Sequence, residues 1–260
     1  MRLGLGSEHG AGGGLQALDP ESMTVAPAWR TTGAPPSNFI TDLAFGAAGS
    51  RWSGQVWVAT GARGGTTGSR LFGSGAATLD TAGTNETTDD VWAGFTALGT
   101  DADGRLPWSG LSSDNVQAVL LDGDTVWLGS AETRWSGADG RYVDGGLSVF
   151  DGARWTARPT GAAGGLGGGG VSSLALGCDG DLWVGTGNMW DHQGSGVFVR
   201  APGSDVHQPS ADAWTRHRYP QLASSNTTSL AVDCERGVVL VGALHHVNNA
   251  DTGGPVGQWS

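Results

Sequence analysis

The sequence predicts an all-β protein built as a β-propeller of four-stranded antiparallel blades, with about five blades in the chain. Three observations lead to this fold class. The 260 residues include 47 glycines, which disfavour long helices, and 12 tryptophans, which carry too much apolar surface for a disordered chain. Short apolar stretches alternate with tight polar turns, as strands and hairpins do. Two tryptophan-centred motifs recur in the same order along the chain.

The first recurring motif is an apolar triplet with tryptophan at its centre, followed by a small residue. It reads VWVA at 56–59, VWLG at 126–129 and LWVG at 182–185. A copy without tryptophan follows as VLVG at 239–242, and a further copy, LGLG at 3–6, opens the chain. We assign this motif to strand b, the second strand of a blade counted outward from the central channel.

The other strands of each repeat surround this motif. Period-two stretches before it predict strand a at 40–45, 116–121, 171–176 and 228–232. Apolar stretches after a glycine-rich loop predict strand c at 14–18, 70–72, 147–150 and 197–199. A second tryptophan series marks strand d at Trp29, Trp92, Trp155 and Trp214. A β-sandwich is the alternative, but it does not explain why both tryptophan series keep one phase through the chain.

These strands form a single predicted domain over 1–260, with blade boundaries roughly at 1–37, 38–112, 113–168, 169–225 and 226–260. The strand order is b-c-d, then three complete sets, then a-b-c. It fits either a five-bladed protein with two incomplete blades or a fragment of a ring of six to eight blades. We favour the fragment.

The central repeats resemble a known family. They read LPWSGLSSDNVQAVLLDGDTVWLGS at 106–130, GGLSVFDGARW at 145–155 and GLGGGGVSSLALGCDGDLWVGTG at 165–187. These segments resemble the two-component-regulator β-propeller repeat: a G-L-x-S-x-x-V stretch, an apolar-Asp turn, a W-x-G-T strand and G-G-L-x-x-F-D. The resemblance covers nearly the whole chain, and streptogramin-lyase-like propellers share part of it. It implies an extracytoplasmic, periplasmic or secreted sensory domain, with a carbohydrate-like ligand.

The charge balance excludes several classes of partner. The chain has 14 basic residues, all arginine, against 25 acidic ones, for a net charge of −11. A protein this acidic lacks the basic surface that nucleic acids and anionic lipids require. No apolar run is long enough to span a bilayer, so we expect no membrane insertion. The first residues, MRLGLGSEHGAGGG, have no apolar core segment and do not read as a signal peptide.

The two cysteines fall at the same place in consecutive repeats. Cys178 ends SLALGC and Cys234 ends SLAVDC, each in a predicted a–b turn. Equivalent turns of adjacent blades lie close enough for a disulfide, which would indicate an oxidising compartment. Two unrelated thiols in small turns are the alternative, and the sequence leaves both open.

Polar and aromatic residues gather in the predicted b–c loops, which share one face of a propeller with the d–a loops. The most ligand-like loop is the insertion at 131–144, because aromatic rings stack on sugars and arginine forks bind anions. The alternative is that Trp135 and Tyr142 anchor this long loop to its own blade. The candidate ligand-binding residues of this face are Arg134, Trp135, Arg141, Tyr142, Trp190, His192, His245, His246 and Asn248.

Catalysis has weaker support in the sequence. Asp191, His192, His245 and His246 are candidate ligands for a divalent metal, but no tight metal-binding spacing is present. There is no G-x-S-x-G elbow, and the glycine run at 164–170 lacks the lysine of a P-loop. We therefore assign no catalytic residue and no cofactor. The leading hypothesis is a non-enzymatic propeller that binds a small molecule, a carbohydrate or a protein partner; the alternative is a metal-assisted lyase or hydrolase that uses the loop histidines.

Overall fold

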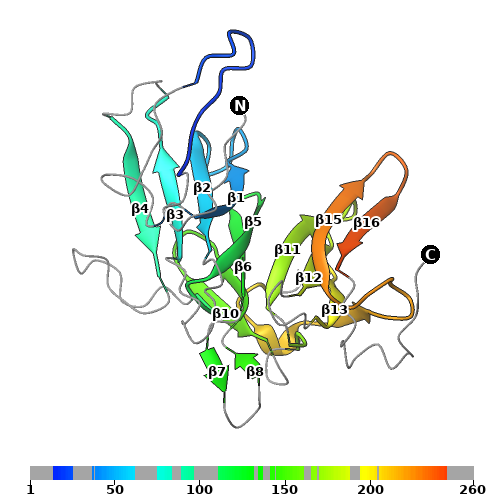
Figure 1. The fold of residues 1–260 in the computed structure, drawn as a ribbon. Helices are drawn as coiled ribbons and strands as arrows, with labels where there is room; N and C mark the ends of the chain where they lie inside the picture. The colour runs from blue at the N-terminus through cyan, green and yellow to red at the C-terminus, as the bar shows by residue number, and fades with distance from the viewer. Residues whose placement is uncertain are drawn as a thin grey trace.

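The computed structural model describes residues 14–25, 37, 39–61, 75–83, 89–96, 111–131, 134–136, 141–143, 145–160, 165–168, 170–187, 194–203 and 205–244. The only helix among them is a 3-10 turn, η1 (Pro209–Ala211). All other regular structure in these residues is β-strand, as the fold class requires (Figure 1).

Three four-stranded antiparallel sheets follow one another along the chain (Figure 1). The first blade contains β1 (Ile40–Phe45), β2 (Gln55–Thr60), β3 (Gly75–Asp80) and β4 (Val91–Phe95). The second contains β5 (Val116–Asp122), β6 (Thr125–Ser130), β9 (Gly146–Phe150) and β10 (Trp155–Pro159). The third contains β11 (Val171–Leu176), β12 (Leu182–Thr186), β13 (Gly196–Arg200) and β14 (Trp214–His217). In each sheet the strands lie in chain order, which is the a-b-c-d order of a blade.

Two smaller sheets complete the described residues. β15 (Thr227–Asp233) and β16 (Val238–Ala243) pair with each other as a two-stranded sheet, which we call the half-blade. β7 (Arg134–Ser136) and β8 (Arg141–Val143) form a hairpin inserted between β6 and β9. The predicted strands a and b are thus confirmed in the four repeats whose strands the structure describes, and Trp92, Trp155 and Trp214 lie on strand d as expected. The predicted strand b at 3–6 and Trp29 lie outside the described residues.

The prediction for strand c was wrong in one blade. We expected it at 70–72, whereas the structure has it at β3, which begins at Gly75. Two of the four buried side chains of GAATLD are alanine, which is a weak strand signal. The predicted strand c at 14–18 does not form a named strand either, although Leu18 makes an isolated antiparallel bridge to Val25.

The core lies between neighbouring blades, where the strand-b tryptophans act as wedges. Trp57 is 0% exposed and stacks on Phe95, 5.1 Å between ring centroids, in a cluster that includes Val126 and Leu128 of the second blade. Trp127 is 2% exposed and occupies the equivalent place between the second and third blades. Because side chains alternate along a strand, each tryptophan faces the next blade while its neighbours face the previous one.

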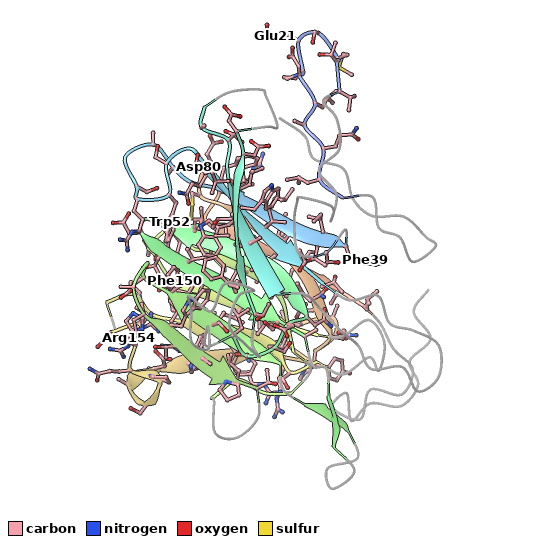
Figure 2. The ribbon with its side chains drawn as sticks, turned by 90° about the vertical axis from the view of Figure 1, so that its left-hand side faces the viewer. Glu21, Phe39, Trp52, Asp80, Phe150 and Arg154 are labelled. Carbon is pink, nitrogen blue, oxygen red and sulfur yellow. A yellow bond between two sulfur atoms is a disulfide. The ribbon has the colours of Figure 1, made fainter. Side chains whose placement is uncertain are left out.

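The sequence analysis did not assign a role to Trp52, which lies in the β1–β2 connection. Its ring meets Trp57 edge-on at 5.1 Å and lies 5.8 Å from Phe150 (Figure 2). Its indole N–H donates to the Asp124 carbonyl oxygen in the β5–β6 turn, 2.9 Å away. Trp52 therefore closes the interface between the first two blades at the end where the a–b turns lie.

A buried ionic cluster joins the second and third blades. The Asp212 carboxylate accepts from Arg158 of β10 at 2.5 Å and from Arg200 of β13 at 2.6 Å, and all three side chains are at least 95% buried. Both guanidinium groups lie over the Trp127 ring, at 5.5 and 5.6 Å from its centroid. The cluster fixes the outer strands of two blades against one wedge.

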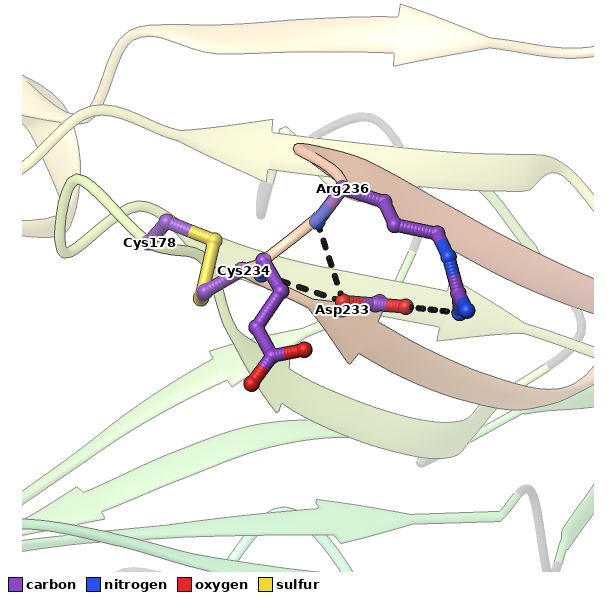
Figure 3. Close-up of a disulfide and its surroundings, with 5 residues drawn as sticks. Cys178, Asp233, Cys234 and Arg236 are labelled. Atoms are coloured by element: carbon purple, nitrogen blue, oxygen red, sulfur yellow. Dashed lines mark hydrogen bonds and ion pairs between the residues drawn. A yellow bond between two sulfur atoms is a disulfide. The ribbon is translucent and has the colours of Figure 1, made fainter.

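Cys178 and Cys234 form a disulfide, with their Cα atoms 5.5 Å apart (Figure 3). Cys178 lies in the β11–β12 turn and Cys234 in the β15–β16 turn, so the bond joins the third blade to the half-blade. The Asp233 carboxylate orders the second turn by accepting from the backbone N–H groups of Glu235 and Arg236, at 3.0 and 3.1 Å.

Candidate ligand-binding face

The b–c loops and the d–a connections lie on one face of the blades, as the sequence predicts. In each repeat the residue just before strand a accepts a hydrogen bond from the residue just after strand b. The four bonds run from Gly61 N to Phe39 O, Ala131 N to Asn115 O, Gly187 N to Gly170 O and Leu244 N to Asn226 O, at 2.8–3.2 Å. We call this surface the loop face.

Polar side chains anchor the base of the loop face. The Ser113 hydroxyl donates to the Ala131 carbonyl oxygen at 2.7 Å, and the Ser130 hydroxyl donates to the Ser113 carbonyl oxygen at 3.1 Å. In the first and third blades the last hydroxyl of strand b donates instead to the glycine that opens strand c, from Thr60 to Gly75 O at 2.7 Å and from Thr186 to Gly196 O at 2.8 Å. These buried groups are used within the protein, so they make a rigid platform and are not themselves contacts for a ligand.

The same connections also join successive blades. The N–H of Gly75, which opens strand c of the first blade, donates to Asp114 O of the next repeat at 2.8 Å. Gly196 does the same to Ser225 O at 2.7 Å. Glycine is required here because both residues have positive φ, and a Cβ on Gly75 would lie 1.9 Å from Phe95 O.

The innermost strands present polar groups between neighbouring blades. The Thr41 hydroxyl donates to Val116 O at 2.7 Å, and the Ser172 hydroxyl donates to Thr227 O at 2.6 Å. The Asp42 carboxylate accepts from the Val119 N–H at 2.9 Å. Burial raises the pKa of Asp42, although hydrogen bonds from the Val119 and Leu43 N–H groups oppose the rise. Asp42 therefore links two inner strands and has no nucleophile or base beside it among these contacts.

The 131–144 insertion contains the β7–β8 hairpin, which projects from the second blade (Figure 1). Its register pairs Trp135 with Tyr142, Arg134 with Val143 and Ser136 with Arg141. The backbone register therefore places the two aromatic residues directly opposite each other across the hairpin.

The remaining candidate residues, Trp190, Asp191, His192, His245, His246 and Asn248, lie outside the described residues. Their assignment as ligand-binding residues, and that of Asp191 and the three histidines as metal ligands, stays a prediction. Among the residues that the structure does describe, no three His, Cys, Asp or Glu side chains are grouped so as to hold a metal ion. The described part of the chain also has no helix long and apolar enough to cross a membrane.

Sequence reasoning missed a polar chain at the other end of the blades. The Thr156 hydroxyl is 2.7 Å from His207 Nδ1, and His207 Nε2 is 2.9 Å from Asp151 Oδ2. Burial acts to raise the pKa of Asp151, but the Arg154 and Ala153 N–H groups and the His207 ring hold it below its ordinary value. Arg154 also donates to the His207 carbonyl oxygen at 3.0 Å. These contacts tie the third-blade loop to the second blade, and no sequence motif signals them.

Comparison with solved structures identifies the same fold in longer proteins. No protein-family model and no curated protein matches the chain. The extracellular domain described as that of hybrid two component system BT4673 from B. thetaiotaomicron aligns with 94% of this chain, at 15% identity and a TM-score of 0.53. PorZ, a surface component of the type-IX secretion system of Porphyromonas gingivalis, aligns with 93% at 18% identity and a TM-score of 0.56. The chain spans only 26% and 31% of these proteins. It therefore has the β-propeller fold, and its structural neighbours include an extracellular domain of a two-component system, the class that its repeats resemble.

Proposed function

We propose that this chain is a non-enzymatic, extracytoplasmic propeller of the sensory type that binds a carbohydrate through its loop face. One observation carries the proposal: the largest b–c insertion forms a projecting hairpin whose register opposes Trp135 and Tyr142. Two aromatic residues opposed in the register of a ribbon suit a site that stacks on sugar rings. The two-component setting of BT4673 and the disulfide, which fits an oxidising compartment, support the extracytoplasmic assignment.

Affinity electrophoresis tests this proposal with defined probes. The chain is run on native gels that contain soluble starch, xylan, mixed-linkage β-glucan or pectic galactan. We expect at least one polysaccharide to retard the chain and Trp135→Ala or Tyr142→Ala to abolish that retardation. Met23→Ala, which changes an exposed apolar side chain far from the hairpin in sequence, is the matched control and should leave it intact.

The enzymatic alternative makes a different prediction with the same gels. Triple substitution of His192, His245 and His246 by alanine should leave retardation unchanged if the protein is a binding module. No retardation by any of the four polysaccharides, with the far-UV spectrum unchanged, would overturn carbohydrate binding. Degradation of any of the four polysaccharides by the chain, detected as new reducing ends or unsaturated products, would overturn the non-enzymatic assignment.

A further inference from the structure

Each inner strand carries a β-bulge at the end that meets the loop face. The pairing of strand a with strand b shifts at the same place in each of the four described repeats, which leaves one extra residue on strand a. These extra residues are Thr41, Gln117, Ser172 and Thr228. A β-bulge re-aims a side chain and is frequent beside functional sites. The bulge residues are therefore positions to examine for ligand contacts.

Gln117 differs from two of the other bulge residues in how its side chain is used. The hydroxyls of Thr41 and Ser172 each donate to the carbonyl oxygen of the first residue of strand a in the next blade, at 2.7 and 2.6 Å. The Gln117 Nε2 group donates instead to Asn115 Oδ1 in its own repeat, at 2.5 Å. The Gln117 amide therefore does not join its blade to the next one.

The first blade holds this amide from the other side. Gly61 follows β2, and a Cβ built on it would lie 2.6 Å from Gln117 Nε2 and 3.3 Å from Asn115 Oδ1. Glycine at position 61 thus lets the amide lie against the backbone of the first blade. A polar group that is already held in place loses little conformational entropy when it binds a ligand.

Part of the hydrogen-bonding capacity of the amide is unused. A glutamine amide has two N–H donors and one carbonyl acceptor, Oε1. In the part of the chain that the structure describes, one N–H of Gln117 has a partner and Oε1 has none. The side chain is half-buried, and Oε1 is not one of the buried polar atoms that lack a partner, so it reaches the surface. One donor and one acceptor of the same amide are therefore open to a ligand.

Gln117 lies beside the point where the β7–β8 insertion leaves the second blade. The insertion begins at Ala131, whose N–H donates to Asn115 O at 2.8 Å. The Asn115 side chain accepts from Gln117, so one residue fixes both the start of the insertion and the amide. The amide is therefore on the same loop face as the hairpin that carries Trp135 and Tyr142.

We propose that Gln117 is a ligand-binding residue of the loop face and that it selects a neutral sugar with two adjacent hydroxyls. This inference rests on the carbohydrate binding proposed above. Each sugar hydroxyl can donate and accept, so two adjacent hydroxyls match the open acceptor and the open donor of one amide. The amide and the Asn115 side chain that holds it are both uncharged, so neither forms an ion pair with the carboxylate of an acidic sugar.

Affinity electrophoresis with the four polysaccharides named above tests the inference, with polygalacturonate added as the acidic probe. Gln117→Leu should weaken the apparent affinity for any polymer that retards the wild type about tenfold, because it removes two hydrogen bonds. Gln117→Glu keeps nearly the same shape but replaces the donor with an acceptor, so it should weaken the affinity as well. Polygalacturonate should retard the wild type less than the best neutral polymer does.

Gln208→Leu is the matched control. Gln208 Nε2 donates to the Asp205 carboxylate at 2.9 Å, so it is also a glutamine held by a neighbouring side chain, but it lies at the opposite end of the blades. Its substitution should leave retardation unchanged. Gly61→Ala displaces the Gln117 amide without removing it and should weaken retardation, whereas Gly94→Ala, where a Cβ has no atom within 4 Å, should not. Far-UV spectra confirm that each variant is folded, and Gln117→Glu keeps the test valid if Gln117→Leu is not.

The outcomes separate this inference from the function on which it rests. If the wild type is retarded and Gln117→Leu and Gln117→Glu are retarded equally, Gln117 is not a ligand contact and carbohydrate binding still stands. If Gln117→Glu alone keeps the wild-type affinity, only an acceptor is used and the pairing with two hydroxyls is wrong. Stronger retardation by polygalacturonate than by every neutral polymer overturns the neutral class. No retardation by any polymer overturns both the inference and the proposed function.

Discussion

Replacing both cysteines with serine removes the covalent link between the third blade and the half-blade. The bond joins residues 56 positions apart, and the loop it closes includes β12, β13, β14 and all of β15. A loop of this length in the unfolded chain corresponds to about 4 kcal/mol of stabilisation through lost chain entropy. The effect should be concentrated at the half-blade, because β15–β16 contacts the rest of the described chain mainly through the third blade.

Urea denaturation followed by tryptophan fluorescence measures this loss. With an m value of about 2–3 kcal/mol/M, a change of about 4 kcal/mol lowers the midpoint by roughly 1.3–2 M. The oxidised wild type should unfold at higher urea than both the reduced wild type and Cys178→Ser/Cys234→Ser. Reductant should not move the double-serine midpoint, which controls for effects of the reductant itself.

Hydrogen exchange locates the effect. Reduction should raise exchange in β15 and β16 before it does so in β5 and β6, which lie in a complete blade with neighbours on both sides. The reasoning fails if the urea midpoints of the oxidised wild type, the reduced wild type and the double-serine variant coincide. It also fails if exchange rises equally in all blades, because the disulfide then does not hold the half-blade in place.

Three further predictions concern buried charge, glycine conformation and pH. Asp212→Ala removes the carboxylate that accepts from two buried arginines and should lower the free energy of unfolding by roughly 3–5 kcal/mol. Arg236→Ala removes an exposed ion pair and should lower it by under about 1 kcal/mol; equal losses in urea denaturation would contradict this. Gly75→Ala should lower the melting temperature more than Gly83→Ala does, because the φ of Gly83 is similar but a Cβ there would have no atom within 4 Å. Equal melting temperatures for the two variants would refute the argument that the close approach of Phe95 O requires glycine at position 75. The pKa of Asp151 is lower in the folded protein than its unfolded-state value of about 3.9, so the ionised carboxylate stabilises the fold above that pH. Asp151→Asn should therefore lower the melting temperature at neutral pH, and this difference should vanish as the pH falls through the folded-state pKa. A difference in melting temperature that does not depend on pH would disprove this.

The loop face has two parts, a hydrogen-bonded base and the loops that project beyond it. Its base is built from serine and threonine hydroxyls that bond within the protein, so ligand contacts must come from other groups, chiefly the loops that project beyond this base. The β7–β8 hairpin is the one such addition whose backbone the structure describes. Its register places Trp135 and Tyr142 directly opposite each other, and substitution of either residue tests that arrangement.

Several parts of the fold were predictable because they depend on local chemistry. The period-two stretches and the apolar triplets located strands a and b in the four repeats that the structure describes, since alternation and β-branched residues are typical of a half-buried strand. The strand-c error at 70–72 has the opposite cause. In GAATLD the small residues are buried by close approach of neighbouring strands, and that closeness is a property of the assembled sheet.

By itself the sequence determined the repeat, the four-stranded blade and the face on which the b–c loops lie. These follow from spacing along the chain, which is a local property. Only the tertiary structure decided that Cys178 bonds Cys234, that Asp212 joins Arg158 to Arg200, and that Leu240 remains uncovered where Trp57 is buried. Each of these depends on residues from different blades, and their distances are fixed by how the sheets pack and not by how far apart the residues stand in the chain.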